Sequence, residues 1–576
     1  MGLVNDRKAA APSANRGERS RRVRHAANGP EGGTDWTRVN WRKANRAVRA
    51  LRQRIFRAAQ RGDLRAVHSL QKLMLRSYAN TLVSVRRVTQ LNTGRHTPGV
   101  DQVVVKTPRA RGRLVDLLCT TQPWRARPAR RLFIPKANGR LRPLGIPTVL
   151  DRCLQARVKN ALEPAWEARF EGTSYGFRPG RGCHDAIAKV YLLANSKGRK
   201  PWVVDADIKG AFDHISHSYL LAALGPFPGR ALIKQWLEAG YLDDGGFHPT
   251  DAGTGQGAVI SPLLANIALH GMEAALGVQR TRAGGIKGNR AVVRYADDFV
   301  VFCETREDAE AVMGVLTAWL AERGLTLSEE KTRIVHLSEG FDFLGFTVRR
   351  YRSPRAKAGY QLFITPSKAA VTKVRRDLGG IWKHQVGANA AAVLAALNPR
   401  IRGWANYFRV GVASRTFSSL DNWMFLRAVR WVNRTHPHKP DAWRRARYWG
   451  PLNPQRADAW VFGNKDTGAY LLKFKWFTIE RHVIVRGTAS PDDPSLRAYW
   501  LARQRARAKA LPPSVQQLAE RQRGVCLLCG ESLFNGEALQ RHHRIPKRDG
   551  GADTYDNLTL LHYYCHQHVH AHTWGA

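Results

Sequence analysis

Two apolar segments that lie far apart in the sequence both run into acidic residues. The stretch 202–204 leads into Asp205 and Asp207, and Asp297-Asp298 separates two apolar stretches that can pair as a hairpin. Carboxylates at the ends of buried strands are costly unless a cation offsets their charge. Mg²⁺ prefers a few carboxylates with phosphate oxygens, and two such ions about 3.5–4 Å apart serve an in-line displacement at phosphorus. The pattern predicts a nucleotidyl-transfer site in an α+β fold, with turn-capping carboxylates as the alternative interpretation.

The charge balance predicts a polyanionic partner. The 576 residues include 93 Lys or Arg and 45 Asp or Glu, a net charge of +48. Such an excess repels itself unless RNA or DNA phosphates neutralise part of it, which excludes an ordinary metabolic enzyme. A hydrophobic content of 43% excludes wholesale disorder. Because no long apolar run or apolar leader is present, we expect a cytoplasmic protein without a membrane partner.

The organisation along the chain is mixed. Residues 1–35 are basic and lack apolar periodicity, which predicts a disordered arm. Apolar residues at helical spacing between 48 and 74 predict two basic amphipathic helices, which either bind RNA or are solvated faces. Strands are expected at 132–134, 202–204 and 291–293, and helices near 215–240, 261–277 and 307–323. Beyond residue 350 the pattern is helical and rich in Arg and Trp to about 450.

The last 51 residues hold three of the seven cysteines and seven of the 20 histidines. Two ligand pairs with two-residue gaps, Cys526/Cys529 and His562/Cys565, have the count and spacing of a tetrahedral structural Zn²⁺ site. A segment this small has too small a hydrophobic core to be stable without such a cross-link. The cysteines therefore predict a metal site and not disulfides.

Several motifs then resemble one family. Residues 295–298 (Tyr-Ala-Asp-Asp) and 207–213 are similar to the metal-binding motifs of reverse transcriptases. Further motifs occur in the order expected of group II intron-encoded reverse transcriptases, at 134–136, 142–147, 174–179, 256–257, 261–262, 327–332 and 343–346. Residues 401–408 and 431–437 resemble the maturase region of that family, and residues 526–566 resemble its His-Asn-His (HNH) endonuclease module. The resemblance implies a right-hand polymerase (fingers and palm), a helical thumb/maturase domain and a small zinc-stabilised ββα-metal domain.

The resemblance also implies roles in polymerisation. Asp207, Asp297 and Asp298 would hold two Mg²⁺ ions. The deoxynucleoside triphosphate would be contacted by Lys136, Arg142, Phe212, Gln256 and Lys331. Within this set, Lys136 and Arg142 would bind the triphosphate. Phe212 would exclude nucleotides with a 2′-hydroxyl, and Lys331 would protonate the leaving pyrophosphate. The family usually has Pro and Gly where this chain has Gly255 and Ala258, which predicts a looser loop and lower activity.

In the nuclease module, His543 would be the general base, and His542 and His566 would bind Mg²⁺ or Mn²⁺. Asn557 would orient the base or a loop. The zinc ligands would be Cys526, Cys529, His562 and Cys565, although other modules of this kind carry Cys in place of His562. The histidines at 568, 570 and 572 are expected in a solvated tail. The alternative is a zinc knuckle that contacts DNA without cutting it.

In the maturase region, basic residues are the expected RNA contacts and most aromatic residues are expected to pack in the core. The candidates are Arg427, Arg430, Arg434, Arg444, Arg445 and Arg447. In the stretch before the module, Arg503, Arg505, Arg507 and Lys509 predict a DNA-contacting connector, with a passive linker as the alternative.

The resemblance implies six parts. They are the disordered basic arm 1–35, a basic helical extension of the fingers at 36–95, fingers and palm at 96–350, the thumb/maturase (X) domain at 351–480, a DNA-binding connector at 481–520 and the HNH domain at 521–576. The implied function is RNA-directed DNA polymerase, splicing maturase and site-specific endonuclease in target-primed reverse transcription (retrohoming). The partners would be group II intron RNA, target DNA and deoxynucleoside triphosphates, at the nucleoid of a bacterial or organellar host. The alternatives are a splicing maturase with an inactive polymerase and an endonuclease with a polymerase scaffold.

Overall fold

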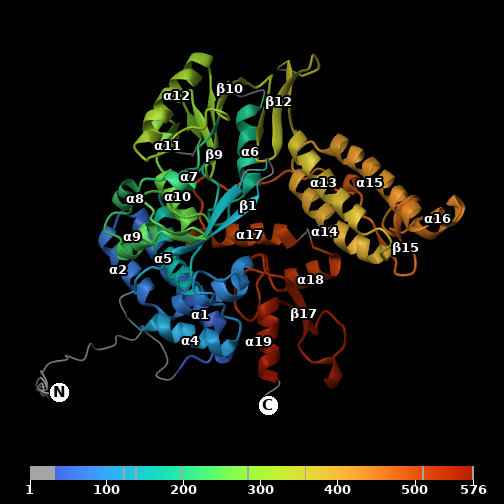
Figure 1. The fold of residues 1–576 in the computed structure, drawn as a ribbon, viewed down its shortest axis with the longest axis horizontal. Helices are drawn as coiled ribbons and strands as arrows, with labels where there is room; N and C mark the ends of the chain where they lie inside the picture. The colour runs from blue at the N-terminus through green and yellow to red at the C-terminus, as the bar shows by residue number, and fades with distance from the viewer. Residues whose placement is uncertain are drawn as a thin grey trace, which may run out of the picture.

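A computed structural model describes residues 33–120, 124–135, 139, 141–195, 199–281, 285–356, 359–508 and 511–573. The expected arm at 1–35 lies outside this range except for residues 33–35, and Lys136 and Lys509 also lie outside it. Helices and small sheets make up the fold (Figure 1), and the described residues form six sheets. In the described ranges no helix is both long and apolar enough to cross a membrane.

The N-terminal segment is a group of helices that packs against one long helix, α5 (Val149–Glu167). Asn40 and Asp63 cap the first two helices by accepting hydrogen bonds from backbone N–H groups. Ile55 and Met74 are fully buried, so the two predicted amphipathic helices are confirmed. The elements are η1 (Trp36–Arg38), α1 (Trp41–Gln60), α2 (Leu64–Arg76), α3 (Tyr78–Arg86), η2 (Arg87–Leu91), η3 (Thr93–His96) and α4 (Pro108–Cys119).

The first sheet has the order β2-β1-β4-β5. Strand β1 (Ala129–Pro135) contains the predicted strand 132–134 and pairs antiparallel with β2 (Leu141–Ile146). Its other edge pairs in parallel with β4 (Tyr241–Asp243), which forms a hairpin with β5 (Gly246–His248).

The central sheet has the order β10-β3-β9-β8 and is antiparallel throughout. Its strands are β3 (Trp202–Asp207), β8 (Ala291–Tyr295), β9 (Asp298–Cys303) and β10 (Arg333–His336). Successive side chains point to opposite faces of a strand. Val204 and Val301 therefore enter one hydrophobic core, and Val203 and Val300 enter another. Both faces of this sheet are buried, which explains why its strands are apolar until they reach the acidic residues.

Helices surround the central sheet. They are α6 (Cys183–Ala194), α7 (Ala211–His214), α8 (His217–Leu224), α9 (Arg230–Glu238), α10 (Ser261–Ala268), α11 (Met272–Ala275) and α12 (Arg306–Ala321). The helices predicted at 215–240 and 261–277 are each divided into two. The short strands β6 (Gln279–Arg280) and β7 (Ile286–Lys287) form a hairpin of their own.

The helical segment begins later than the sequence predicted. Strand β12 (Phe346–Arg352) crosses residue 350 and pairs with β11 (Phe341–Phe343) and β13 (Tyr360–Pro366). Four helices follow, α13 (Lys368–His384), α14 (Ala390–Phe408), α15 (Ser414–Thr435) and α16 (Asp441–Tyr448). A small sheet of β14 (Trp449–Gly450), β15 (Val461–Asn464) and β16 (Ala469–Tyr470) and the turn η4 (Phe474–Trp476) come next.

The C-terminal segment returns to the N-terminal helices (Figure 1). Its elements are η5 (Pro494–Leu496), α17 (Arg497–Ala508), α18 (Pro513–Arg521), β17 (Leu539–His543), η6 (Lys547–Asp549), β18 (Leu558–His562) and α19 (Tyr563–Thr573). Trp36, Trp41 and Val85 share one hydrophobic core with Leu560 and Leu561. The two ends of the described chain are thus packed together.

Candidate functional site

Three predicted carboxylates meet at one end of the central sheet. Asp207 is the last residue of β3 and lies opposite Asp298, the first residue of β9. Tyr295 also pairs with Asp298, so Ala296 and Asp297 form the turn between β8 and β9. Ala296 has φ of 61°, which is uncommon for a residue with a side chain and makes the turn tight.

The carboxylates repel one another. Burial of the carboxyl group, followed by the charges of Asp297 and Asp207, raises the pKa of Asp298 to about 7. Burial and then Asp207 also raise the pKa of Asp297, and the charges of Arg142 and Lys331 oppose that rise. Lys331 donates a hydrogen bond to Asp207, and this bond raises the pKa of Lys331. A divalent cation would relieve the repulsion, so the residues fit the Mg²⁺ site that the sequence predicted.

A buried network supports the turn from beneath. Arg294 is 2% exposed and donates hydrogen bonds to the side-chain oxygen of Asn266 (3.1 Å) and to the carbonyl oxygen of Ala296 (3.2 Å). Asn266 in turn donates to the carbonyl oxygen of Gly176 (2.9 Å). Gly176 lies so close to the turn that a Cβ atom there would be 2.3 Å from the backbone nitrogen of Ala296. The motif at 174–179 therefore packs directly against the turn that carries Asp297, a contact that its composition alone does not reveal.

The predicted nucleotide contacts lie on neighbouring elements. Phe212 is in α7, and its ring meets the edge of Phe177 with centroids 6.1 Å apart. Gln256 donates to the carboxylate of Asp213 (3.2 Å). Arg142 is exposed on β2, where its charge reaches Asp297. Lys136 lies outside the described residues.

The glycine-rich loop before α10 is bonded to neighbouring elements by its backbone. The backbone N–H of Thr254 donates to the carbonyl of Phe212 (2.7 Å), and that of Gly145 donates to the carbonyl of Gln256 (2.6 Å). The hydroxyl of Ser261 donates to the carbonyl of Gly255 (2.9 Å). Gly255 has φ of 58°, which proline cannot adopt because its ring fixes φ near −65°. The departure from the family pattern therefore changes the shape of the loop.

A second cluster contains the four predicted zinc ligands. The ligand atoms of Cys526, Cys529, His562 and Cys565 all lie within 4.8 Å of one another, and all four residues are buried. Nε2 of His562 is 3.0 Å from the carbonyl oxygen of Ser532 and donates to it, so Nδ1 faces the sulfur atoms. This Cys₃His cluster, with its imidazole fixed from outside, fits a tetrahedral Zn²⁺ ion.

A third cluster contains His542, His566 and His570, whose ligand atoms also lie within 4.8 Å of one another. Burial and then the charges of the other two histidines lower the pKa of His542, which favours its neutral, metal-binding form. The sequence identified His542 and His566 and expected His570 in a solvated tail; the structure places His570, which is exposed on α19, beside the other two. His566 and His570 are four residues apart on α19, and this spacing places them on one face of a helix.

The remaining residues of the module have separate partners. Nε2 of His543 is 2.6 Å from the carboxylate of Asp553, a partner that the sequence did not indicate. The side chain of Asn557 accepts from the N–H of Ile545 (2.8 Å) and donates to the carbonyls of Ile545 (3.0 Å) and Ala552 (2.9 Å). Asn557 therefore joins two parts of the loop that follows His543.

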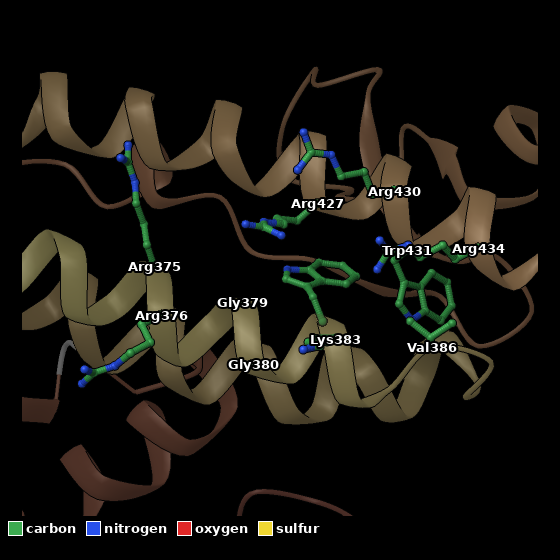
Figure 2. Close-up of a pocket in the computed structure, with 11 residues that line it drawn as sticks. Arg375, Arg376, Gly379, Gly380, Lys383, Val386, Arg427, Arg430, Trp431 and Arg434 are labelled. Atoms are coloured by element: carbon green, nitrogen blue, oxygen red, sulfur yellow. The ribbon is translucent and has the colours of Figure 1, made fainter.

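A basic groove lies between α13 and α15 (Figure 2). It encloses about 430 Å³, and its described lining holds six cations and no carboxylate. The cations are Arg375, Arg376, Lys383, Arg427, Arg430 and Arg434. Trp431, beneath them, is 2% exposed and Phe408 is 4% exposed, so the expectation that most aromatic residues here pack in the core holds for both. The groove has the charge and shape to accept a phosphate backbone.

Other predicted nucleic-acid contacts are engaged within the protein. Arg444 donates to the carbonyls of His436 and Pro437. Arg447 pairs with Asp466. Arg503 donates to the carbonyl of Val483 (2.8 Å).

Four family models match the chain in order. They are described as N-terminal domain of reverse transcriptase (residues 36–118), reverse transcriptase (RNA-dependent DNA polymerase) (134–348), group II intron, maturase-specific domain (371–449) and HNH endonuclease (526–572). The three carboxylates lie in the second match, the basic groove in the third, and both metal-ligand clusters in the fourth. The fold is thus a mixed α+β multidomain reverse transcriptase fold with a C-terminal HNH region that contains the Cys₃His cluster.

Curated relatives agree with these matches. Protein YkfC of Escherichia coli is 37% identical over 312 residues, 47% of this chain and 81% of YkfC. The group II intron-encoded protein LtrA of Lactococcus lactis is 29% identical over 382 residues, 52% of this chain and 63% of LtrA. Maturase-like protein 1 of Euglena gracilis is 26% identical over 382 residues, 64% of this chain and 76% of the relative. The chain belongs to the group II intron-encoded reverse transcriptase/maturases that carry an HNH endonuclease domain.

Proposed function

We propose that this protein is an RNA-directed DNA polymerase, a splicing maturase and a site-specific DNA endonuclease that acts in target-primed reverse transcription. The observation that carries the proposal is the meeting of Asp207, Asp297 and Asp298 at the end of the central sheet, with Asp207 and Asp298 in register. Three mutually repelling carboxylates are explained by metal binding and are costly without it.

In the polymerase site, Asp207, Asp297 and Asp298 would hold two Mg²⁺ ions. When bound, these ions activate the 3′-hydroxyl of the primer and stabilise the departing pyrophosphate. Lys331 lies beside Asp207 and keeps its proton until it protonates the pyrophosphate. Phe212 packs beneath the deoxyribose and excludes a 2′-hydroxyl.

The remaining nucleotide contacts come from elements around the carboxylates. Arg142 and Lys136 bind the triphosphate, and Gln256 lines the nucleotide pocket. The bonds that hold the loop around Gly255 support an active polymerase over a splicing maturase with an inactive one.

In the maturase role, the chain would bind the intron RNA that encodes it. The helices α1 and α2 and the groove between α13 and α15 supply basic surface for the phosphates. The RNA performs the transesterifications, and the protein stabilises the folded RNA by binding. A splicing assay at near-physiological Mg²⁺ with and without protein tests this role, and equal rates would disprove it.

In the nuclease role, His542, His566 and His570 would hold a Mg²⁺ or Mn²⁺ ion, which stabilises charge on the scissile phosphate when bound. Nε2 of His543 donates to Asp553, so Nδ1 is the atom that takes a proton from water. Asn557 holds the loop after the base. Zn²⁺ in the Cys₃His cluster is structural.

We also propose a division into domains that matches these roles. It comprises a basic arm at 1–35, a helical extension of the fingers at 36–95, fingers and palm from 96, a thumb/maturase domain to 480, a connector at 481–520 and the HNH domain at 521–576. Because β12 and β13 form one sheet with β11, we place the start of the thumb after β13, at residue 367.

Three assays on one purified sample test the proposal. Primer extension on an RNA template, intron splicing and strand nicking of target DNA should all be positive for the wild-type protein. Replacement of Asp297 and Asp298 by Ala should abolish extension and leave RNA binding intact. His543→Ala should abolish nicking and leave extension intact. Extension retained by the double aspartate variant would overturn the polymerase assignment.

A further inference from the structure

The Cys₃His cluster lies against the N-terminal helices, more than 400 residues away in sequence. The side chain of Asn45 in α1 donates to the carbonyl of Cys529 (3.0 Å). Arg49, one turn further along α1, donates to the carbonyl of Gly530 (3.2 Å). The turn that carries a zinc ligand is therefore fixed to α1 by its own backbone.

Arg86, the last residue of α3, contacts one of the predicted zinc ligands directly. Its Nη2 atom donates to Sγ of Cys565 at 3.1 Å and lies 3.9 Å from the carboxylate of Glu537. Arg86 is 5% exposed. Its guanidinium carbon lies 4.6 Å from the centroid of the Trp41 ring. A guanidinium buried to this degree is costly unless an anion faces it.

A zinc-loaded cluster would supply the negative charge that the buried guanidinium of Arg86 requires. Three thiolates and a neutral imidazole around Zn²⁺ leave one net negative charge, part of it on the sulfur of Cys565. If the three thiols were neutral, Glu537 would be the one anion that Arg86 faces among the described residues, and their separation of 3.9 Å is longer than a hydrogen bond. The position of Arg86 therefore matches the metal-loaded cluster.

We propose that Arg86 completes the zinc site from the reverse transcriptase side, so that zinc bound by Cys526, Cys529, His562 and Cys565 holds the HNH segment on helices α1 and α3. This inference rests on the zinc assignment made above. Arg86 is a positioning residue, and zinc acts as a clamp between two functional parts of the chain. Loss of zinc would release the HNH segment from helices α1 and α3, which themselves pack on α5 of the reverse transcriptase region.

The first experiment uses the wild-type full-length protein and needs no variant. Its zinc content is measured, the ion is removed with a chelator, and hydrogen exchange is followed in both states. Zinc removal should increase exchange in α1 and α3 as well as in the cluster, while α13–α15 stay unchanged. Unchanged exchange in α1 and α3 would overturn the clamp. A wild-type protein without zinc would overturn the zinc assignment and the clamp together.

The second experiment isolates Arg86. The Arg86→Met variant keeps the stem that packs on Trp41 but removes the charge, and Arg87→Met is the matched control because Arg87 is its exposed neighbour. We expect Arg86→Met to release zinc to a competing chelator about tenfold faster. Arg86→Lys should fall between it and the wild type, and Arg87→Met should match the wild type. Zinc-loaded Arg86→Met that releases zinc at the wild-type rate would disprove the role of Arg86 and leave the zinc assignment standing.

Discussion

A single methyl group at Gly176 tests whether the buried network sets the geometry of the carboxylates. A Cβ atom at this position would lie 2.3 Å from the nitrogen of Ala296 and 2.9 Å from the carbonyl carbon of Tyr295. Both atoms are backbone of the turn that carries Asp297, so no side-chain rotation can relieve the contact. Asn266 donates to the carbonyl of Gly176, and Arg294 donates to the carbonyl of Ala296, so both sides of this contact are held in place. Gly176→Ala must therefore displace the turn itself.

The size of the effect follows from the distances. Ordinary contact for a Cβ atom begins at 3.4 Å, so the turn must move by about 1 Å. A displacement of about 1 Å at a reacting centre costs on the order of 100-fold in rate. Overpacking of a buried site also costs about 1–3 kcal/mol of stability. We expect a folded protein whose polymerase rate falls far more than its stability.

The assay is single-turnover primer extension on an RNA template with saturating Mg²⁺ and nucleotides, together with a measurement of RNA affinity. Gly176→Ala should extend about 100-fold more slowly and bind RNA with near wild-type affinity. Gly182→Ala is the control, because nothing lies within 4 Å of the added atom. If Gly176→Ala extends within twofold of the wild type, the contact does not set the geometry of the carboxylates.

Three further predictions concern separate sites. Gly255→Pro, which restores the usual family residue, should lower the free energy of unfolding by more than about 1 kcal/mol, because proline cannot adopt φ of 58°; an unchanged denaturant midpoint would contradict this. Asp298 has a pKa raised from 3.8 to about 7, so its contribution to the stability of the metal-free protein is complete below pH 4 and is lost as the pH rises through 7. Thermal unfolding should therefore show a larger stabilisation by Mg²⁺ at pH 8 than at pH 6, and Asp298→Asn should remove that difference. His570→Ala should weaken Mn²⁺ binding at the nuclease site at least about tenfold and abolish nicking, with primer extension unchanged as the control.

Local patterns predicted β3, β8 and β9 of the central sheet, but not β10 and not the register of the strands. The apolar strands that end at Asp207 and begin at Asp298 are visible because both faces of the sheet are buried. The pairing of Asp207 with Asp298 depends on packing between segments 91 residues apart, which no local pattern encodes. The family motifs carried this information instead. The predicted start of the helical segment at residue 351 missed the end of β12 and all of β13; basic residues fill the end of β12, whereas β13 carries no charged residue and is simply short.

The contacts that join distant segments could not be predicted for the same reason. Arg86 and Cys565 are 479 residues apart; spacing identified Cys565 as a zinc ligand, but nothing distinguishes Arg86 among the 93 basic residues. The four-residue spacing between His566 and His570 could have predicted that they share a helix face, but the neighbouring histidines suggested a solvated tail. Gly255 was recognised as a departure, although only the backbone conformation reveals that the loop needs a glycine there.

The ion pairs of buried arginines should depend less on salt concentration than the phosphate contacts of exposed arginines. Arg52 in α1 makes a double hydrogen bond to Asp492 (2.8 and 2.7 Å) and a single one to Glu163 (2.8 Å), and its side chain is 14% exposed. Exposed cations lose their hold on phosphates as salt rises, whereas buried pairs are screened much less. Raising the salt concentration from 0.1 to 1 M should therefore release RNA while hydrogen exchange in α1 stays slow. Faster exchange in α1 at the concentration that releases RNA would mean that the RNA, and not Arg52 with its two carboxylates, holds the N-terminal helices in place.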